Sequence, residues 1–457
     1  MIKVSVILPV YNAEKYIREC LNSILMQTLD DIEIICIDDA STDGTKEILA
    51  EYARSYSMIN IITNAVNSYA GVSRNRGLEM ASGKYVIFLD ADDIYECDML
   101  EKAYVKAELL DADVCIFQED QFVDGQDRHL EYPYNHRLLN RLSERGSFSP
   151  SDVKNVIFSL WNGWAWDKLF AREYIIDTGL RFQKMRSSED AFFVHAAIAS
   201  AKRITVINEV LVHHRIGNSN SVSNTRDKAW ESCLLYLKEL RRYLMQRKRF
   251  SIYEKSYINW SADFLYWNYQ TLNDVNREKL AASMREFFLF DLMIEQYEKE
   301  YFYNAFSWWF VRCIIYREDN AIPLTEKERY EKVYGLNAEK IETLHKYMSE
   351  HNWKVAIWGA GIRGCAFARI YRNVWTELRT VYDMDESKWG KELCSGITVR
   401  GFDGSQAEKT DCIIVLNSAH LLSVQKLVPE GNITLFDMNT YLNLCDRLEE
   451  CFISCEE

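Results

Sequence analysis

One short segment of this chain carries three aspartates directly after an apolar run: residues 85–93 read YVIFLDADD. In extended backbone the side chains of Asp90 and Asp92 lie on the same side, whereas that of Asp93 points elsewhere. Two carboxylates with this spacing suit a hard divalent ion such as Mg²⁺ or Mn²⁺, which usually bridges protein carboxylates to substrate phosphates. The segment therefore predicts a cation that holds a nucleotide diphosphate, although aspartates that cap a following helix are an alternative explanation.

The segments that must position these carboxylates alternate between strand and helix. Apolar, β-rich runs cover residues 3–8, 32–37, 59–63, 84–89 and 112–117, with helix-like stretches between them. This rhythm predicts a mostly parallel sheet covered by helices. Ligands of such sheets bind outside the carboxyl ends of the strands. Tyr11, Asp38 and Asp39 also come just after strands, so we expect them to share one edge with the aspartates.

The residues of these segments, and the order in which the segments follow one another, are similar to those of a known family. The segments VSVILPVYNAEKYIRECLNSILMQT, IEIICIDDASTDGT and AGVSRNRGLEMASGKYVIFLDADD resemble the nucleotide-sugar-binding half of family 2 glycosyltransferases, which have a GT-A fold. The resemblance covers about the first 118 residues. Weaker similarity to the acceptor side of the family continues in WDKLF (166–170), SSEDAFF (187–193) and HHRIGNSNSVS (213–223).

The resemblance implies roles for residues that face the nucleotide. Pro9 and Tyr11 match the end of the first strand, where the aromatic ring lies against the base, although Tyr11 as core packing is an alternative. Asp39 matches a carboxylate that accepts a hydrogen bond from the uracil imide, which favours a uridine nucleotide; a turn-forming aspartate is the alternative. Arg74 matches a basic residue near the nucleotide, where it would donate charge-assisted hydrogen bonds to the two phosphates, and a solvated helix charge is the alternative. Asp90 is also assigned to binding of the nucleotide-sugar.

One departure from the family lies close to Arg74. Many relatives have Gly followed by Pro where this chain has Tyr69 and Ala70. The loop that carries Arg74 is therefore expected to be bulkier here, which puts its contact with the nucleotide in doubt.

On the acceptor side, Glu189 and Asp190 match the Glu-Asp pair at the start of a helix. The resemblance implies that Asp190 is the general base that deprotonates the acceptor hydroxyl, with Glu189 in support, and that a single displacement inverts the anomeric configuration. Two acids at a helix N-terminus are also favoured by the helix dipole alone.

Further candidates follow the apparent strand ITVINEVLV. Arg215 is a candidate for stabilising the leaving diphosphate. Either His213 or His214 is a candidate third metal ligand, and a structural histidine is the alternative. Three residues are candidates for lining the acceptor pocket or for core packing: Trp164, Trp166 and Lys168.

The later part of the chain contains a second α/β unit. The stretch GAGIRG (359–364) follows a strand and precedes a helix, and Asp383 ends the next strand. This is the context of a dinucleotide-binding turn, with Gly359, Gly361 and Gly364 allowing close approach of a pyrophosphate. It resembles Rossmann-like domains, and a nucleotide-binding module, a docking domain and a remnant without a ligand remain open.

These patterns predict three parts: a GT-A domain over residues 1–224, divided near residue 118, a helical region over 225–350, and a small Rossmann-like domain over 351–457. The 68 acidic and 54 basic residues give a net charge of -14, which disfavours nucleic acid and anionic lipid but allows a local basic patch that docks a membrane-borne substrate. No apolar run approaches the ~20 residues of a membrane span. The 12 cysteines lack a CxxC pair and are expected to be reduced thiols.

We therefore expect a cytoplasmic, Mn²⁺- or Mg²⁺-dependent inverting glycosyltransferase. It would transfer a sugar from a UDP-sugar to a glycan or lipid-linked acceptor, with peripheral membrane association as an option. The alternatives are an NAD-dependent oxidoreductase or regulatory protein centred on GAGIRG, and a noncatalytic scaffold. A nucleotidyltransferase is disfavoured, because LPVYNAEKY is not a Gly- and Lys-rich loop.

Overall fold

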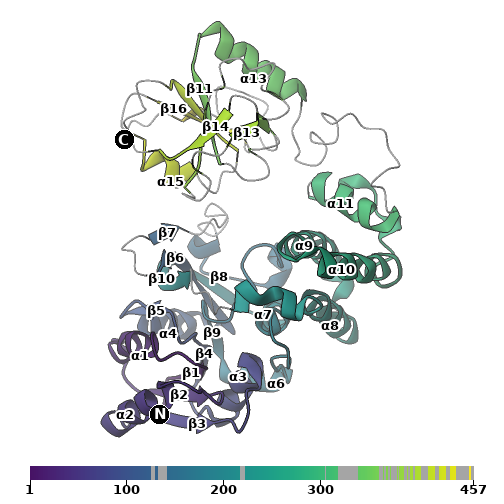
Figure 1. Ribbon diagram of the computed structural model, residues 1–457. Coiled ribbons are helices and arrows are strands. Elements are labelled where there is room, and N and C mark those ends of the chain that lie inside the picture. The colour runs from purple at the N-terminus through teal and green to yellow at the C-terminus, as the bar shows by residue number, and fades with distance from the viewer. Residues whose placement is uncertain are drawn as a thin grey trace. The chain divides into compact units, whose positions relative to one another are not determined.

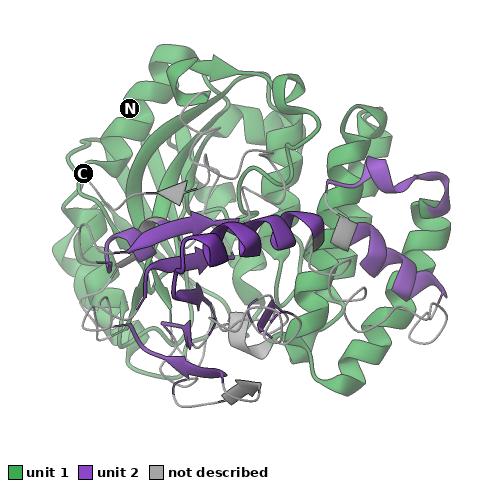
Figure 2. Ribbon diagram, turned by 90° about the horizontal axis from the view of Figure 1, so that it is seen from above, with its two compact units in different colours: residues 1–294 green, residues 295–457 purple. Residues whose placement is uncertain are grey.

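The structure is a computed structural model, and its elements fall into two compact units, Met1–Ile294 and Glu295–Glu457 (Figure 2). It describes residues 1–124, 129–131, 142–216, 222–303, 305–316, 338–359, 364, 367–368, 371, 378, 380–384, 389, 392–394, 397–402, 410–416, 421–428, 433–438 and 452–453.

The strands of the first unit are β1 (Val4–Val10), β2 (Ile32–Asp38), β3 (Ile59–Thr63), β4 (Tyr85–Phe88), β5 (Ile94–Tyr95), β6 (Val114–Val123), β7 (His129–Glu131), β8 (Ser147–Phe148), β9 (Lys168–Ala171) and β10 (Ile204–Ile216). Its α-helices are α1 (Ile17–Leu25), α2 (Thr45–Ser55), α3 (Tyr69–Met80), α4 (Met99–Leu110), α6 (Arg172–Thr178), α7 (Glu189–Ser200), α8 (Ser232–Gln246), α9 (Phe250–Thr271) and α10 (Asp274–Glu286). Short helical turns cover Pro150–Val153, Val222–Ala229, Phe287–Asp291, Ile294–Gln296 and Lys299–Tyr301.

Within the described residues these strands form one mixed sheet in the order β3-β2-β1-β4-β9-β6-β10-β5, with β7 beside β6 and β8 beside β10 (Figure 1). Strands β3, β2, β1 and β4 are parallel to one another. Strand β9 runs antiparallel between β4 and β6, and β5 pairs antiparallel with β10. The predicted mostly parallel sheet is confirmed.

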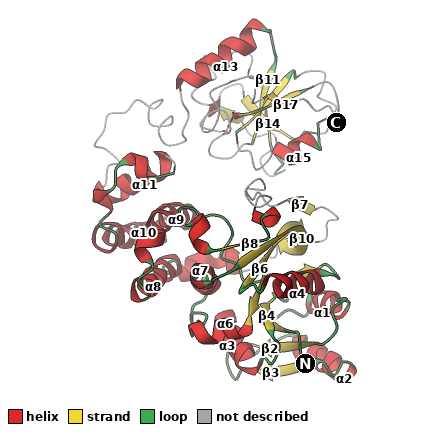
Figure 3. Ribbon diagram, turned by 180° about the vertical axis from the view of Figure 1, so that it is seen from behind, coloured by secondary structure: helices red, strands yellow, loops and turns green. Residues whose placement is uncertain are grey.

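Helices cover both faces of this sheet (Figure 3). One face buries alternate residues of the strands, such as Val6, Leu8 and Ile34, against α1, α2 and α4. The opposite face packs against α3, α6 and α7, where the rings of Phe182 and Phe193 stack with centroids 4.0 Å apart. Burial of both faces explains why the strands read as continuous apolar runs rather than as alternating ones.

Helix α3 lies unusually close to the sheet because it carries a glycine at the contact. A Cβ atom on Gly77 would lie 2.4 Å from Cγ2 of Ile7 and 2.9 Å from Cδ1 of Ile37. Any side chain here would push α3 away from β1 and β2. The close approach matters because α3 carries Arg74.

Helices α8, α9 and α10 follow the sheet and account for the aromatic pattern of this region. Tyr236, Tyr253 and Tyr257 are buried, and the hydroxyl of Tyr257 donates a 2.6 Å hydrogen bond to the carbonyl of Leu237. The predicted helical character after residue 225 is confirmed, whereas the proposed boundary between residues 224 and 225 stays a prediction.

The second unit contains α11 (Ala305–Tyr316), α13 (Ala338–Glu350), α15 (Leu421–Gln425) and the strands β11 (Val355–Trp358), β12 (Thr380–Tyr382), β13 (Glu392–Cys394), β14 (Ile397–Arg400), β15 (Cys412–Val415), β16 (Thr434–Asp437) and β17 (Phe452–Ile453). The described strands form a sheet in the order β13-β14-β12-β11-β15-β16-β17. The five from β14 to β16 are parallel, and the edge strands β13 and β17 are antiparallel. The predicted second α/β domain is confirmed.

The glycine-rich turn begins directly after β11. Gly359 has a φ of +104°, which favours glycine, and a Cβ on Gly364 would lie 1.8 Å from the carbonyl oxygen of Gly359. Asp383 is buried at the end of β12, and Gly361 lies outside the described residues. Strand order changes direction at β11 and β15, which is where ligands bind in sheets of this kind.

Two sequence expectations concern the whole chain. Over the part of the chain that the structure describes, no helix is long and apolar enough to cross a membrane. Cys36, Cys115 and Cys412 are buried free thiols, as expected from their positions in apolar strands.

Candidate active site

The ends of three adjacent parallel strands form the edge at which the candidate residues gather. Strand β1 pairs with β2 on one side and with β4 on the other. Tyr11, Asp39 and Asp90 follow these strands and therefore lie along one edge, as the sequence predicted. Tyr11 is 49% exposed, so its ring presents a face to solvent, and Pro9 is half-buried opposite Ile37.

Asp39 is buried, and its carboxylate holds the start of α3. It accepts hydrogen bonds from the backbone N–H groups of Ser68 (2.9 Å) and Tyr69 (2.8 Å) and from the side-chain amide of Asn64 (2.5 Å). The aspartate is thus a fixed, multiply bonded carboxylate beside the end of β2. Recognition of a uracil imide by Asp39 stays a prediction.

Tyr69 begins α3 with a φ of +69°, a left-handed conformation that is costly for a residue with a side chain. This is the position at which many relatives have glycine. Its ring is 40% exposed and lies 6.0 Å from the guanidinium of Arg186. The bulkier loop expected from the sequence is therefore present, and it adds an aromatic side chain at the entrance to α3.

Arg74 joins the aspartate segment to the Glu-Asp pair. Its guanidinium donates to Oδ1 of Asp90 at 2.7 Å and to Oε1 of Glu189 at 2.8 Å, and it is almost fully buried. A phenyl ring, that of Phe182, lies beneath it at 5.4 Å. The arginine therefore spans two carboxylates that are 99 residues apart in sequence, and its contact with a diphosphate stays a prediction.

The Glu-Asp pair stands at the first turn of α7, after Ser188, which has a φ of +60°. Glu189 is buried and paired with Arg74, whereas Asp190 is half-buried and accepts a 2.8 Å hydrogen bond from the N–H of Ala191. Burial and the neighbouring Glu189 carboxylate raise the pKa of Asp190 to about 7. A carboxylate with this pKa exchanges protons readily near neutral pH.

Asp93 is fully buried and differs in this from Asp90 and Asp92, which are both partly exposed. It accepts a 2.8 Å hydrogen bond from the N–H of Arg215 and pairs with Nδ1 of His214 at 3.1 Å. Burial lowers the pKa of His214, but the Asp93 carboxylate outweighs burial and raises it to about 9. At neutral pH His214 is therefore an imidazolium, and burial raises the pKa of its partner Asp93 above the usual range of a carboxyl.

The replacement of Asp93 by Asn is expected to lower the free energy of unfolding by about 3 kcal/mol, because the partly exposed imidazolium of His214 loses its buried counter-charge. Urea denaturation at pH 7 measures this, with the exposed Asp177→Asn on α6 as control. In the wild type the contribution of His214 is fully present below pH ~6.5 and is lost as the pH rises through about 9. An unchanged urea midpoint in Asp93→Asn would contradict a structural role for the pair.

Two tryptophans complete the surroundings of His214. The ring of Trp166 stacks on His214 with centroids 5.2 Å apart, and Trp164 stacks on Trp166 at 4.8 Å. Lys168 is fully buried and donates to the carbonyls of Asn162 (3.1 Å) and Trp164 (2.9 Å). Lys168 therefore fixes the segment that carries the tryptophans, and an acceptor role for Trp164 and Trp166 stays a prediction.

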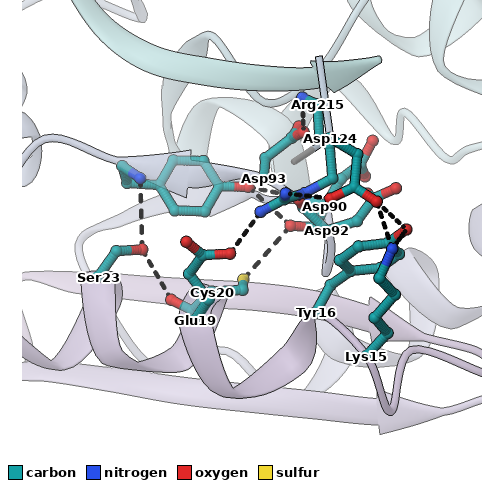
Figure 4. A network of polar contacts seen from close by, with 11 residues as sticks. Lys15, Tyr16, Glu19, Cys20, Ser23, Asp90, Asp92, Asp93, Asp124 and Arg215 are labelled. Carbon is teal, nitrogen blue, oxygen red and sulfur yellow. Dashed lines mark hydrogen bonds and ion pairs between the residues drawn. The ribbon is translucent and has the colours of Figure 1, made fainter. Parts of the chain in front are cut away.

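Arg215 lies at the centre of a network that links β10 to α1 and to the aspartate segment (Figure 4). Its side chain donates to the carbonyl of Asp92 (2.7 Å), to Oδ1 of Asp124 (3.0 Å) and to Oε2 of Glu19 (2.5 Å). The ring of Tyr16 lies 4.8 Å from the guanidinium. This arginine holds the backbone of the segment in place, and leaving-group stabilisation stays a prediction.

The short strand β5 explains why residues so far apart in sequence meet here. It follows the aspartates directly and pairs antiparallel with β10, which places His213 opposite Ile94. Nδ1 of His213 forms a hydrogen bond with Oδ1 of Asp120 at 2.6 Å, and its Nε2 forms one with Oε1 of Glu96 at 2.9 Å. Among the residues that the structure describes, no three His, Cys, Asp or Glu side chains converge on a metal position.

The residues that suit a divalent cation are therefore Asp92 and Asp90. Both are partly exposed oxygen donors at the end of β4, although Asp90 also pairs with Arg74, whereas Asp93 is fully buried and both histidines are held by carboxylates. Two carboxylates leave several coordination positions for phosphate oxygens and water, which is how Mg²⁺ is commonly bound. The donor set thus fits a cation that is completed by a substrate.

Sequence reasoning missed several residues of this site. Glu19 and Asp124, which hold Arg215, and Asp120, which holds His213, were not singled out. No local pattern marks them, since the sheet order decides which residues lie beside each of them. The alternation Trp164-Ala165-Trp166 beside HHR is a signal that could have suggested the aromatic stack on His214.

Comparison with known proteins bears on the whole arrangement. Residues 5–154 match the family model described as Glycosyl transferase family 2. EpsH of Bacillus subtilis (strain 168), whose name describes it as a glycosyltransferase, is 30% identical over 258 residues, which cover 55% of this chain and 72% of EpsH. The poly(ribitol-phosphate) beta-glucosyltransferase of Bacillus spizizenii is 38% identical over 210 residues, 45% of this chain and 31% of that protein.

Among solved structures, S. aureus TarS 1–349 has a TM-score of 0.51 at 20% identity, over 69% of this chain and 88% of that one. This likeness concerns the fold. The similarity to EpsH extends over most of that protein's length. It points to the same family as the matched family model. The chain belongs to the family 2 glycosyltransferases, with a GT-A fold.

Proposed function

We propose that this glycosyltransferase moves a sugar from a UDP-sugar to a hydroxyl group of a glycan or lipid-linked acceptor, with inversion at the anomeric carbon. The observation that carries the proposal is the Arg74 bridge, which ties Asp90 to Glu189 at 2.7 and 2.8 Å. Through this bridge Asp90, a candidate ligand of the cation, lies close to the Glu-Asp pair that contains the candidate base Asp190. Transfer by single displacement needs the base and the departing diphosphate around the same anomeric carbon.

In the proposed mechanism each residue has one task. Tyr11 stacks on the uracil ring, and Asp39 accepts its imide N–H. Asp190 takes the proton of the acceptor hydroxyl as that oxygen attacks the anomeric carbon, and Glu189 with Arg74 keeps Asp190 in position. Asp92 and Asp90 would hold Mn²⁺ or Mg²⁺, which supplies positive charge to the leaving diphosphate.

The class of acceptor is proposed from relatives. One similar protein is named for glucosyl transfer to poly(ribitol-phosphate), and another is named for teichuronic acid biosynthesis. Surface polysaccharide synthesis is therefore the proposed setting. The enzyme would act on a growing or lipid-linked glycan at the cytoplasmic face of the membrane.

A second nucleotide site is proposed in the C-terminal unit. The order β14-β12-β11-β15-β16, the positive φ of Gly359 and the close packing of Gly364 support it. Asp383 stands where an acidic residue binds a ribose in dinucleotide-binding sheets. The proposal covers nucleotide binding only and includes no redox reaction.

Thermal shift of the full chain against UDP-, GDP-, CDP- and dTDP-sugars and NAD(H), each with and without Mn²⁺, tests both proposals. We expect UDP-sugars to raise Tm only with the metal, by about 2–4 °C or more near 100 Kd. NAD(H) should raise Tm without the metal. Stabilisation by CDP-sugars instead would contradict the role of Asp39, because cytosine has no ring imide N–H, and stabilisation by GDP-sugars instead would contradict a UDP-sugar donor. No response to any nucleotide sugar would contradict the proposed reaction.

A further inference from the structure

We propose that a basic pocket beside the candidate base binds the anionic groups of the glycan acceptor, an inference that rests on the proposed function. The pocket has a volume of about 460 Å³ and lies between the segment that precedes α7 and the exposed side of α8. Its lining residues are Gln183, Lys184, Met185, Leu235, Lys238, Glu239 and Arg242.

The position of the pocket relates it to the candidate active site. The lining residues that precede α7 end at Met185, four residues before Glu189. Four residues of extended chain span at most about 14 Å. Gln183 and Glu189 border the same glycine, since a Cβ on Gly71 would lie 2.4 Å from the carbonyl oxygen of Gln183 and 2.9 Å from Cγ of Glu189. Helices α7 and α8 pack side by side (Figure 1). A saccharide that presents a hydroxyl to Asp190 can therefore continue into this pocket.

The charge of the pocket is opposite to that of the chain. Three cationic side chains and one carboxylate line it, whereas the chain as a whole carries a net charge of -14. Within the described residues no carboxylate lies within ion-pair distance of Lys184, and Lys238 pairs only loosely with Asp291, at 3.6 Å. Arg242 pairs with Glu239. Lys184 and Lys238 are thus available to an anion, which a local positive potential attracts.

The remaining lining residues suit a saccharide rather than a simple ion. Gln183 is half-buried at the pocket wall, and the amide of its side chain is of a kind that forms hydrogen bonds with hydroxyl groups. Leu235 is 46% exposed and, with Met185, offers apolar surface to the C–H face of a sugar ring. The pocket therefore fits a sugar that carries a carboxylate or a phosphate.

The test compares three probes by calorimetry on the full chain: oligogalacturonate, inorganic polyphosphate and neutral maltohexaose. We expect the wild type to bind oligogalacturonate, and the double variant Lys184→Ala/Lys238→Ala to bind it about tenfold more weakly, the loss expected for hydrogen bonds to charged groups. The control Lys202→Ala/Lys279→Ala removes the same charge from exposed residues outside the pocket and should bind as the wild type does.

Each other outcome would overturn part of the inference. Equal binding of maltohexaose would contradict recognition of charge, and polyphosphate binding as tight as that of oligogalacturonate would contradict recognition of a saccharide. Unchanged affinity in the Lys184/Lys238 variant would contradict the location. Binding of UDP with Mn²⁺ is measured on the same preparations: a wild type that binds UDP but no anionic glycan overturns this inference alone, and one that binds the glycan but no UDP overturns the proposed function.

Discussion

Replacement of Asp190 by Asn is expected to lower kcat for sugar transfer about 10²- to 10⁴-fold, the range that positioned acid–base groups usually supply. The amide keeps the size of the side chain and its hydrogen bond to the N–H of Ala191, but it cannot take a proton. Affinity for UDP with Mn²⁺ should stay within twofold, since Asp190 is assigned to the acceptor side. Initial rates with saturating donor measure kcat, and calorimetry measures UDP binding.

Asp177→Asn is the matched control, because Asp177 is exposed on the neighbouring helix α6. It should transfer sugar at the wild-type rate. Full turnover by Asp190→Asn would show that another group is the base. Loss of UDP binding in the same variant would move Asp190 from the acceptor to the donor side.

The pH profile of kcat provides an independent check on Asp190. Burial and the adjacent Glu189 raise the pKa of this carboxyl to about 7, and a general base works in its deprotonated form. The rate of wild-type transfer should therefore rise with pH through about 7 and level off above it. This rising limb should be absent from the residual activity of Asp190→Asn. A profile that is flat between pH 5.5 and 8.5 would contradict the assignment.

The second large effect is expected for Asp92→Asn. Removal of one of two candidate carboxylate ligands should weaken the binding of UDP in the presence of Mn²⁺ by at least about 100-fold, since even residues that only support a metal ligand account for about 10- to 100-fold. Without Mn²⁺, wild type and variant should bind UDP equally weakly. Calorimetric titration of UDP with and without Mn²⁺ separates the two contributions.

Asp30→Asn, an exposed aspartate outside the site, is the control for charge. Asp93→Asn is a useful contrast, because Asp93 is expected to affect stability through His214. Metal-dependent UDP binding that survives in Asp92→Asn would sink the assignment of the cation site. A loss of thermal stability in Asp92→Asn equal to that in Asp93→Asn would reassign Asp92 to a structural role.

Much of the fold could be predicted because its signals are local. The apolar runs that end before Tyr11, Asp39 and Asp90 mark parallel strands, and the carboxyl ends of such strands meet at one edge. The insertion of β9 between β4 and β6, by contrast, has no local signal. WDKLF reads as a short apolar segment, and only the pairing of β9 with both neighbours shows where it lies.

The candidate site was predictable in its residue types but not in its contacts. The sequence marks Arg74 and Glu189 as charged residues in motifs, yet their ion pair joins positions 115 residues apart. Asp39 was expected to face a base, and in the structure both of its oxygens accept hydrogen bonds from backbone N–H groups at the start of α3. Such contacts depend on which helices lie over the strand ends, and a motif read by itself does not contain that information.

The Arg74 bridge has a thermodynamic consequence for the order of substrate binding. In the protein alone, Asp90 is the counter-ion of Arg74, so a cation that takes up Asp90 competes with the guanidinium for it. Arg74 then keeps Glu189 as its remaining carboxylate partner and becomes available to a phosphate oxygen. By linkage, donor binding and the setting of the Glu-Asp pair influence each other reciprocally. The affinity for the acceptor should therefore change when the metal–nucleotide complex is bound, and the affinity for the donor should change by the same factor when the acceptor is bound.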